Sequence, residues 1–108
     1  IQMSPAHILN QINQSLRKIE DREKQIGHSY FMNNSKQIDN IEELKQIYIY
    51  DIIPLVSEYC YNDYENMGKI IGEAFIDQDS QELKDELIYG TDDYFSSEII
   101  NHFGDKND

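Results

Sequence analysis

His28 has the side chain in this sequence that best suits acid–base catalysis, because imidazole titrates near neutral pH and can serve as a base or a proton shuttle. No second His, Cys or obvious acid stands at a spacing that would orient it, and His7 and His102 are distant and lack a Glu-x-x-His companion. The alternative role is structural: His28 and Ser29 would hydrogen-bond exposed backbone groups where a helix turns at Gly27. We favour the structural role.

The sequence lacks the parts with which a P-loop enzyme holds a nucleoside triphosphate and its magnesium ion. No Gly-x-x-x-x-Gly-Lys-[Ser/Thr] loop occurs, so no run of backbone N–H groups with a following Lys can cradle the phosphates. No apolar strand ends in the paired acids that hold magnesium. These absences predict a chain that binds no nucleotide or metal cofactor by itself.

The charge of the chain is strongly negative and unevenly distributed. The net charge is −12, and residues 1–36 carry five Lys and Arg against three Asp and Glu, which leaves +2 there and −14 in the remainder. An acidic chain repels phosphate backbones, so we expect no direct nucleic-acid contact. The mildly basic first third is the part suited to lie near nucleotide phosphates.

The length of 108 residues indicates one domain with a small core. No run of about 18 apolar residues is present, so we expect no membrane-spanning helix. Cys60 is the single cysteine and has no partner at metal-ligand spacing. The simplest setting for such a chain is the reducing cytoplasm.

Apolar spacing predicts three principal helices, near residues 5–24, 41–60 and 63–71. Ser4 and Pro5 form a good helix start, and Asn40 with Glu43 resembles a capping box. Pro54 removes a backbone hydrogen bond inside the second helix, so we expect a kink near Tyr50 or Asp51.

Residues 73–108 are expected to form an acidic extension packed on the helical part at 1–72. Within it we expect a short strand around Phe75-Ile76, and a helix from an Asp79-Ser80 cap to about Glu86. Leu87-Ile88-Tyr89 suits a strand or a helix end, and Asp92 or Asp93 is expected to cap a final helix. The predicted fold is mainly α: a small helical bundle with a minor strand element in the C-terminal tail.

Several tyrosines cluster in the middle of the chain. They are Tyr48, Tyr50, Tyr59, Tyr61 and Tyr64. Proteins that stack nucleic-acid bases interleave such rings with basic residues, whereas the neighbours here include Asp51, Glu58 and Asp63. The cluster therefore indicates core packing or subunit contact.

An ordered set of motifs extends over roughly residues 8 to 72. In order they are Asn13-x-x-Leu16, Asp21-Arg22, Gln25-Ile26-Gly27-His28-Ser29-Tyr30-Phe31-Met32, Ile52-Ile53-Pro54-Leu55-Val56, Glu58-Tyr59-Cys60-Tyr61-Asn62-Asp63 and Ile70-Ile71-Gly72. The set resembles the C-terminal helical lid subdomain of McrB-type AAA+ ATPases, the motor subunits of modification-dependent restriction systems. Since the chain begins at Ile1 and has no phosphate loop, we expect it to be a piece of such an ATPase.

The resemblance implies a function for the parent protein. It would bind GTP or ATP with magnesium, assemble into a ring and work with a nuclease subunit in the restriction of modified DNA. This chain would close over nucleotide bound by the missing AAA+ core and transmit its state to neighbouring subunits.

The resemblance also implies roles for particular residues. Lids of this kind send a basic side chain towards the phosphates; Arg22 is the first candidate, and Arg17 and Lys24 compete with it. Solvated surface charge is the alternative for Arg22, because Asp21 and Glu23 flank it.

The segment from Ile26 to Met32 is expected to form a seam with the core. Gly27 can adopt unusual backbone angles, and the adjacent Tyr30 and Phe31 point to opposite sides in an extended segment. If the seam exists, at least one of Tyr30, Phe31 and Met32 is exposed in the isolated chain. If all three fill this domain's own core, the motif is structural.

A stand-alone acidic interaction module is the alternative function, because the balance of −14 after residue 36 suits a basic partner. A Walker-type loop encoded upstream of Ile1 would favour the lid, and a gene that starts near Ile1 would favour the module.

We predict that the isolated chain hydrolyses neither GTP nor ATP, because it has no phosphate loop and no magnesium-binding acids. Phosphate release by the purified chain measures this. Turnover above blank that is lost on Arg22→Ala would contradict the prediction.

Overall fold

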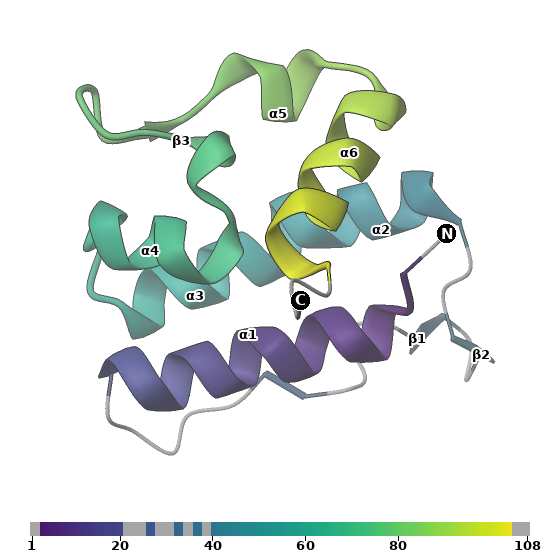
Figure 1. The fold of residues 1–108 in the computed structure, drawn as a ribbon, viewed down its shortest axis with the longest axis horizontal. Coiled ribbons are helices and arrows are strands. Elements are labelled where there is room, and N and C mark those ends of the chain that lie inside the picture. Colours follow the sequence, from purple (N-terminus) through teal and green to yellow (C-terminus); the bar gives the residue numbers. More distant parts are fainter. Residues whose placement is uncertain (1–2, 21–25, 28–31, 34–35, 38–39, 105–108) are drawn as a thin grey trace.

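The computed structural model describes residues 3–20, 26–27, 32–33, 36–37 and 40–104, and it is mainly helical, as predicted (Figure 1). The elements in chain order are α1 (Pro5–Glu20), β1 (Met32–Asn33), β2 (Lys36–Gln37), α2 (Ile41–Ile47), the π-helical turn η2 (Tyr48–Ile52), α3 (Ile53–Tyr59), α4 (Tyr64–Ile71), the 3-10 turn η3 (Glu73–Phe75), β3 (Ile76–Asp77), β4 (Glu82–Leu83), α5 (Asp85–Tyr89) and α6 (Asp92–Phe103).

Helix α1 begins as its sequence predicts. The backbone N–H of His7 donates to the Ser4 hydroxyl at 3.2 Å, and Pro5 occupies the first helical position. Ile8, Ile12 and Leu16 lie on one side of the helix and are buried to 1% exposure or less. The predicted extension of this helix beyond Glu20 lies outside the described residues.

The second predicted helix is continuous from Ile41 to Tyr59, but its middle is a π-helical turn. Asn40 caps its start by accepting from the Glu43 N–H at 2.8 Å. The N–H of Ile53 reaches back five residues to the Tyr48 carbonyl, and Pro54 follows without a donor. The helix is unbroken, as expected, and a π-turn lies where we expected a kink, at Tyr50 and Asp51.

Helix α4 follows a cap by Asp63, whose carboxylate accepts from the Asn66 N–H at 3.1 Å. It ends at Gly72, which has a φ of +124°. A Cβ at this position would lie 3.0 Å from Cδ2 of Phe75, so both the backbone angle and the close approach of the ring require glycine. The predicted third helix and its stop at Gly72 are confirmed.

The segment after Gly72 contains a hairpin that corrects one prediction. The expected helix from Asp79-Ser80 to Glu86 is absent; instead the Asp77 carboxylate accepts from the N–H groups of Asp79 and Ser80 at 3.0 and 3.3 Å. This side-chain-to-backbone turn competes with a helix start and lets Ile76 pair with Leu83 across β3 and β4. The expected strand around Phe75-Ile76 is therefore present as β3.

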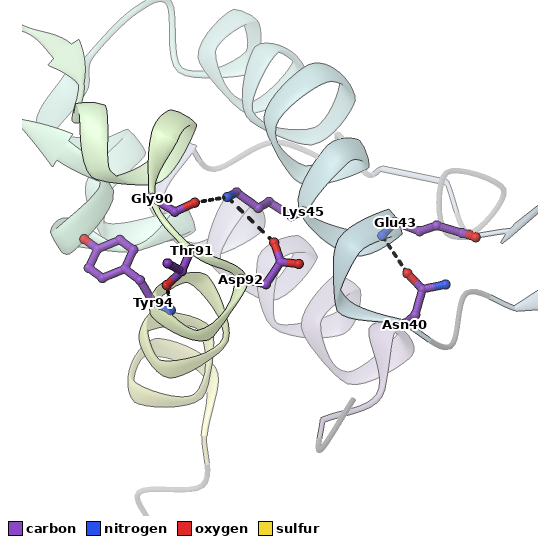
Figure 2. A network of polar contacts seen from close by, with 7 residues as sticks. All are labelled: Asn40, Glu43, Lys45, Gly90, Thr91, Asp92 and Tyr94. Atoms are coloured by element: carbon purple, nitrogen blue, oxygen red, sulfur yellow. Dashed lines mark hydrogen bonds and ion pairs between the residues drawn. The ribbon is translucent and has the colours of Figure 1, made fainter.

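The last two helices follow the predicted order with one change of cap. Helix α5 ends at Tyr89, so Leu87 to Tyr89 is a helix end. Helix α6 is capped by Thr91, whose hydroxyl oxygen accepts from the Tyr94 N–H at 3.1 Å, and not by Asp92 or Asp93 (Figure 2). Both acids lie instead in the first turn, where negative charge stabilises the helix dipole.

One apolar core connects these elements. Helix α6 lies between α1 and the α2 end of the long helix and contacts both (Figure 1). Phe75, Leu87 and Phe95 from the segment after Gly72 are fully buried in the same cluster as Ile12 of α1 and Val56 of α3.

Lys45 joins α2 to the start of α6. It is 8% exposed, and its ammonium group donates to the Gly90 carbonyl at 2.8 Å and lies 3.9 Å from the Asp92 carboxylate (Figure 2). The hydrogen bond satisfies a charge that is otherwise costly to bury.

We predict that Tyr48→Phe destabilises the fold by about 1–2 kcal/mol, because it removes the hydroxyl that donates to the Ile71 carbonyl at 2.6 Å. Burial raises the pKa of Tyr48 well above its ordinary value of 10.0. The unfolded chain therefore loses this proton first, so the stabilisation is complete below pH 10.0 and declines as pH rises above it.

Urea unfolding from pH 8 to 11 measures both effects. Tyr48→Phe should show a shallower alkaline loss of stability than the wild type. Tyr50→Phe is the matched control, because Tyr50 is 64% exposed. Equal stability and equal pH dependence in the two variants would contradict the role given to Tyr48.

Candidate functional site

Asn13 holds the start of the Ile-Gly-His-Ser motif in place. Its side chain lies on the buried side of α1, 7% exposed. Its amide oxygen accepts from the Ile26 N–H at 2.8 Å and its amide nitrogen donates to the Ile26 carbonyl at 3.2 Å. Both backbone groups of a buried residue are therefore satisfied by one side chain.

The Asn13 contact explains why two motifs 13 residues apart occur together. Ile26 is 2% exposed and belongs to the core, whereas the next residue, Gly27, is exposed. The chain therefore leaves the core at Gly27 from an anchored position. Sequence reasoning gave Asn13 no role, although an amide on the apolar side of a helix, next to Ile12 and before Leu16, is a signal for a buried hydrogen bond.

The structure places part of the predicted site. Arg17 lies on α1 with an exposed side chain, and Lys18 beside it is also exposed. Arg22 and Lys24, and the motif residues His28, Ser29, Tyr30 and Phe31, lie outside the described residues. The side chain of Met32 is not described either, so the predicted exposure of the seam stays a prediction.

The outward side of α1 differs in charge from the rest of the described surface. His7, Asn10, Gln14 and Arg17 recur there at spacings of three and four, and all are exposed. No Asp or Glu precedes Glu20 in the sequence. Among the residues that the structure describes, no ion pair joins Arg17 or Lys18 to an acid.

The two described histidines bind backbone carbonyls. Nε2 of His7 lies 2.9 Å from the Phe103 carbonyl at the end of α6, and Nε2 of His102 lies 3.1 Å from the Ile70 carbonyl at the end of α4. Unpaired carbonyls at helix ends need such partners. His7 and His102 are therefore structural, and among the described residues no cluster of His, Cys, Asp and Glu is suited to hold a metal ion.

A hollow of about 760 Å³ lies at the start of α2. Its lining includes Glu42, Glu43 and Asp92 beside Asn40 and Gln46. This negative lining would repel phosphate groups, so the hollow does not suit a nucleotide. In the same described ranges, no helix has the length and apolar character needed to span a bilayer.

We predict that Asn13→Ala destabilises the chain by about 2–3 kcal/mol, because it leaves both backbone groups of Ile26 buried without partners. Amide hydrogen exchange at Ile26 and Gly27 should accelerate more than exchange in α4. Asn10→Ala, on the exposed side of the same helix, is the control and should leave both rates unchanged. Uniform acceleration in every helix would contradict a local anchoring role.

Comparison with known proteins agrees with the geometry of the helical part. No curated protein and no solved structure gives a significant match. The family model for the alpha-helical lid domain of McrB matches residues 4–68, which include α1, the Asn13–Ile26 contact, the long helix and most of α4. The match covers more than half of the chain, and the chain therefore belongs to the family of McrB alpha-helical lid domains.

Proposed function

We propose that this chain closes over a nucleotide bound by the AAA+ core of its parent protein and passes the nucleotide state to neighbouring subunits. Membership of the McrB lid family implies association with such a core. The nucleotide would be GTP or ATP with magnesium, all held by the core. The parent would be the GTPase or ATPase, and this chain would contribute no bond-breaking residue.

The observation that carries the proposal is the Asn13–Ile26 contact. A lid that transmits a state must move as one body and join the core through a segment of defined position. Asn13 gives the motif segment a fixed starting point on α1, and Gly27 then leaves the core of this domain. A seam segment that is hydrogen-bonded to α1 at its first residue can move together with the helices. A loop without such a contact would move independently of them.

The distribution of charge supports an orientation for the lid. Arg17 and Lys18 lie near the end of α1, whose single acidic residue is its last one, Glu20, and the other described acidic residues lie on later elements. Phosphate groups attract guanidinium and repel carboxylates, so we infer that the end of α1 faces the nucleotide. Arg17 is the described candidate for that contact, with Arg22 and Lys24 following it in the sequence.

The assembly that this lid would serve is a ring of AAA+ subunits with a nuclease partner in restriction of modified DNA. The acidic surface supports a role in protein contacts and argues against direct contact with DNA. Arg17 would meet the nucleotide-binding core, and the acidic surfaces would meet other protein.

We predict that one of three substitutions in the parent protein, Arg17→Gln, Arg22→Gln or Lys24→Gln, weakens nucleotide binding about tenfold or more. Loss of one charge-assisted hydrogen bond to phosphate is worth about 1.5–3 kcal/mol. Nucleotide affinity and ring assembly are measured for each variant, with the melting temperature as a check on folding. Lys18→Gln removes the same charge from a neighbouring position and is the control.

The result for the whole set decides the proposal. If all three variants and the control bind nucleotide like the wild type, the end of α1 does not face the phosphates. If Lys18→Gln weakens binding as much as the strongest of the three, the effect is general electrostatics, and the assignment of a particular basic residue fails.

A further inference from the structure

Helix α6 is tied to α2 at its start. The ammonium group of Lys45 on α2 donates to the Gly90 carbonyl at 2.8 Å and lies 3.9 Å from the carboxylate of Asp92, the first residue of α6 (Figure 2). Lys45 is 8% exposed, so this contact is partly shielded from the water that would compete for it. We name it the lysine clamp.

The other end of α6 is tied to α1 and α4. Nε2 of His7 on α1 donates at 2.9 Å to the carbonyl of Phe103, the last residue of α6. Nε2 of His102 donates to the Ile70 carbonyl of α4 at 3.1 Å. A carbonyl can only accept, so the imidazole nitrogen is the donor in both contacts. We name the contact between His7 and Phe103 the histidine clamp.

Between the two clamps, α6 packs on both α1 and α2. The side chains of Phe95, Ile99 and Phe103 are 3% exposed or less and belong to the core. At the other end of the long helix, α3 contacts α1 directly, whereas the most extensive contact of α2 outside its own helix is with α6. The α2 end of the long helix is therefore held to α1 chiefly through α6.

We propose that α6 is a strap that locks the α2 end of the long helix to α1, and that the two clamps fix the ends of this strap. Apolar burial attracts without direction, whereas a hydrogen bond requires a particular distance and angle. The buried side chains of α6 therefore hold it on the bundle, and the clamps set its position. The π-turn at Tyr48–Ile52 separates α2 from α3, and helices bend at such turns. Loosening the strap would free α2 to bend there.

The strap deepens the proposed function, and its part in transmission rests on that function. A movement of α1 at the nucleotide would reach the α2 end only while the strap connects the two. The family match ends at residue 68, so the strap comes from sequence beyond the matched region. The connection itself needs no nucleotide and can be tested on this chain.

Amide hydrogen exchange of this chain, followed by NMR under native conditions, tests the strap. In the double variant Lys45→Met, His7→Ala we expect the amides of α2 and α6 to exchange about tenfold faster, because both clamps are lost. Exchange in α3 and α4 should keep its wild-type rates. His7→Gln retains a side-chain N–H donor and should restore slow exchange at the end of α6.

A matched double variant controls for the loss of charge and of side-chain volume. Lys69→Met removes the same charge from a lysine whose side chain is 53% exposed, and Gln14→Ala truncates an exposed side chain of α1. This pair should leave exchange in α2 and α6 unchanged. The melting temperature checks that each variant is folded. If the clamp double variant does not fold, His7→Ala alone opens one clamp at an exposed position and should speed exchange at the end of α6.

The parent protein tests the part of the strap in transmission. There the clamp double variant should bind nucleotide like the wild type and lose nucleotide-dependent assembly severalfold. The proposed nucleotide contact can fail separately: Arg17→Gln, Arg22→Gln and Lys24→Gln would then all bind nucleotide normally. In that case faster exchange of α2 and α6 in the clamp variant would still support the strap.

Either of two exchange results would overturn the strap. Faster exchange of equal size in all helices would show that the clamps add only to global stability. Wild-type exchange in α2 and α6 would show that apolar packing alone fixes α6. In the parent, normal assembly together with faster exchange of α2 would overturn the part of the strap in transmission.

Discussion

The fold depends on one fully buried side chain, Tyr48, which begins the π-turn of the long helix. Its ring packs edge-on against Phe75, Phe95 and Phe103 at centroid distances of 6.0, 5.5 and 6.5 Å. Its hydroxyl donates to the carbonyl of Ile71 at the end of α4. One residue therefore joins the long helix to α4, η3 and α6, and burial of the ring is acceptable only because the hydroxyl finds this acceptor.

The carbonyls at helix C-terminal ends are satisfied by side chains that come from distant parts of the chain. The side chains of Tyr48 and His102 hydrogen-bond the carbonyls at the end of α4, and the side chain of His7 hydrogen-bonds the carbonyl at the end of α6. These bonds replace local caps and connect elements up to 96 residues apart in sequence. The segment after Gly72 lies beyond the matched family region. It supplies aromatic rings to the shared core and hydrogen-bond partners to the helices of that region.

The sequence predicted the helical bundle because its apolar spacing and the helix starts at Ser4-Pro5 and Asn40 are local signals. The prediction of a helix at Asp79-Ser80 was wrong, because the side chains that cap helices also stabilise turns. The pairing of Ile76 with Leu83 favours the turn here. At the candidate site the motif was recognisable, but the Asn13–Ile26 contact was not, because it depends on where the chain returns to α1. The burial of Lys45 depends in the same way on the position of the Gly90 carbonyl.

The π-turn lets the long helix keep one side buried in the core and the opposite side exposed along its length. Leu44, Tyr48, Ile52, Val56 and Cys60 are buried at strict spacings of four, and each is 2% exposed or less. In a regular α-helix four residues rotate about 40° beyond a full turn, so four such steps would carry the last residue far from the side of the first. The wider π-turn at Tyr48–Ile52 offsets this rotation. The same correction keeps Gln46, Tyr50, Pro54 and Glu58 aligned on the opposite side, so the constraint that packs the core also brings these four exposed side chains to one side of the helix.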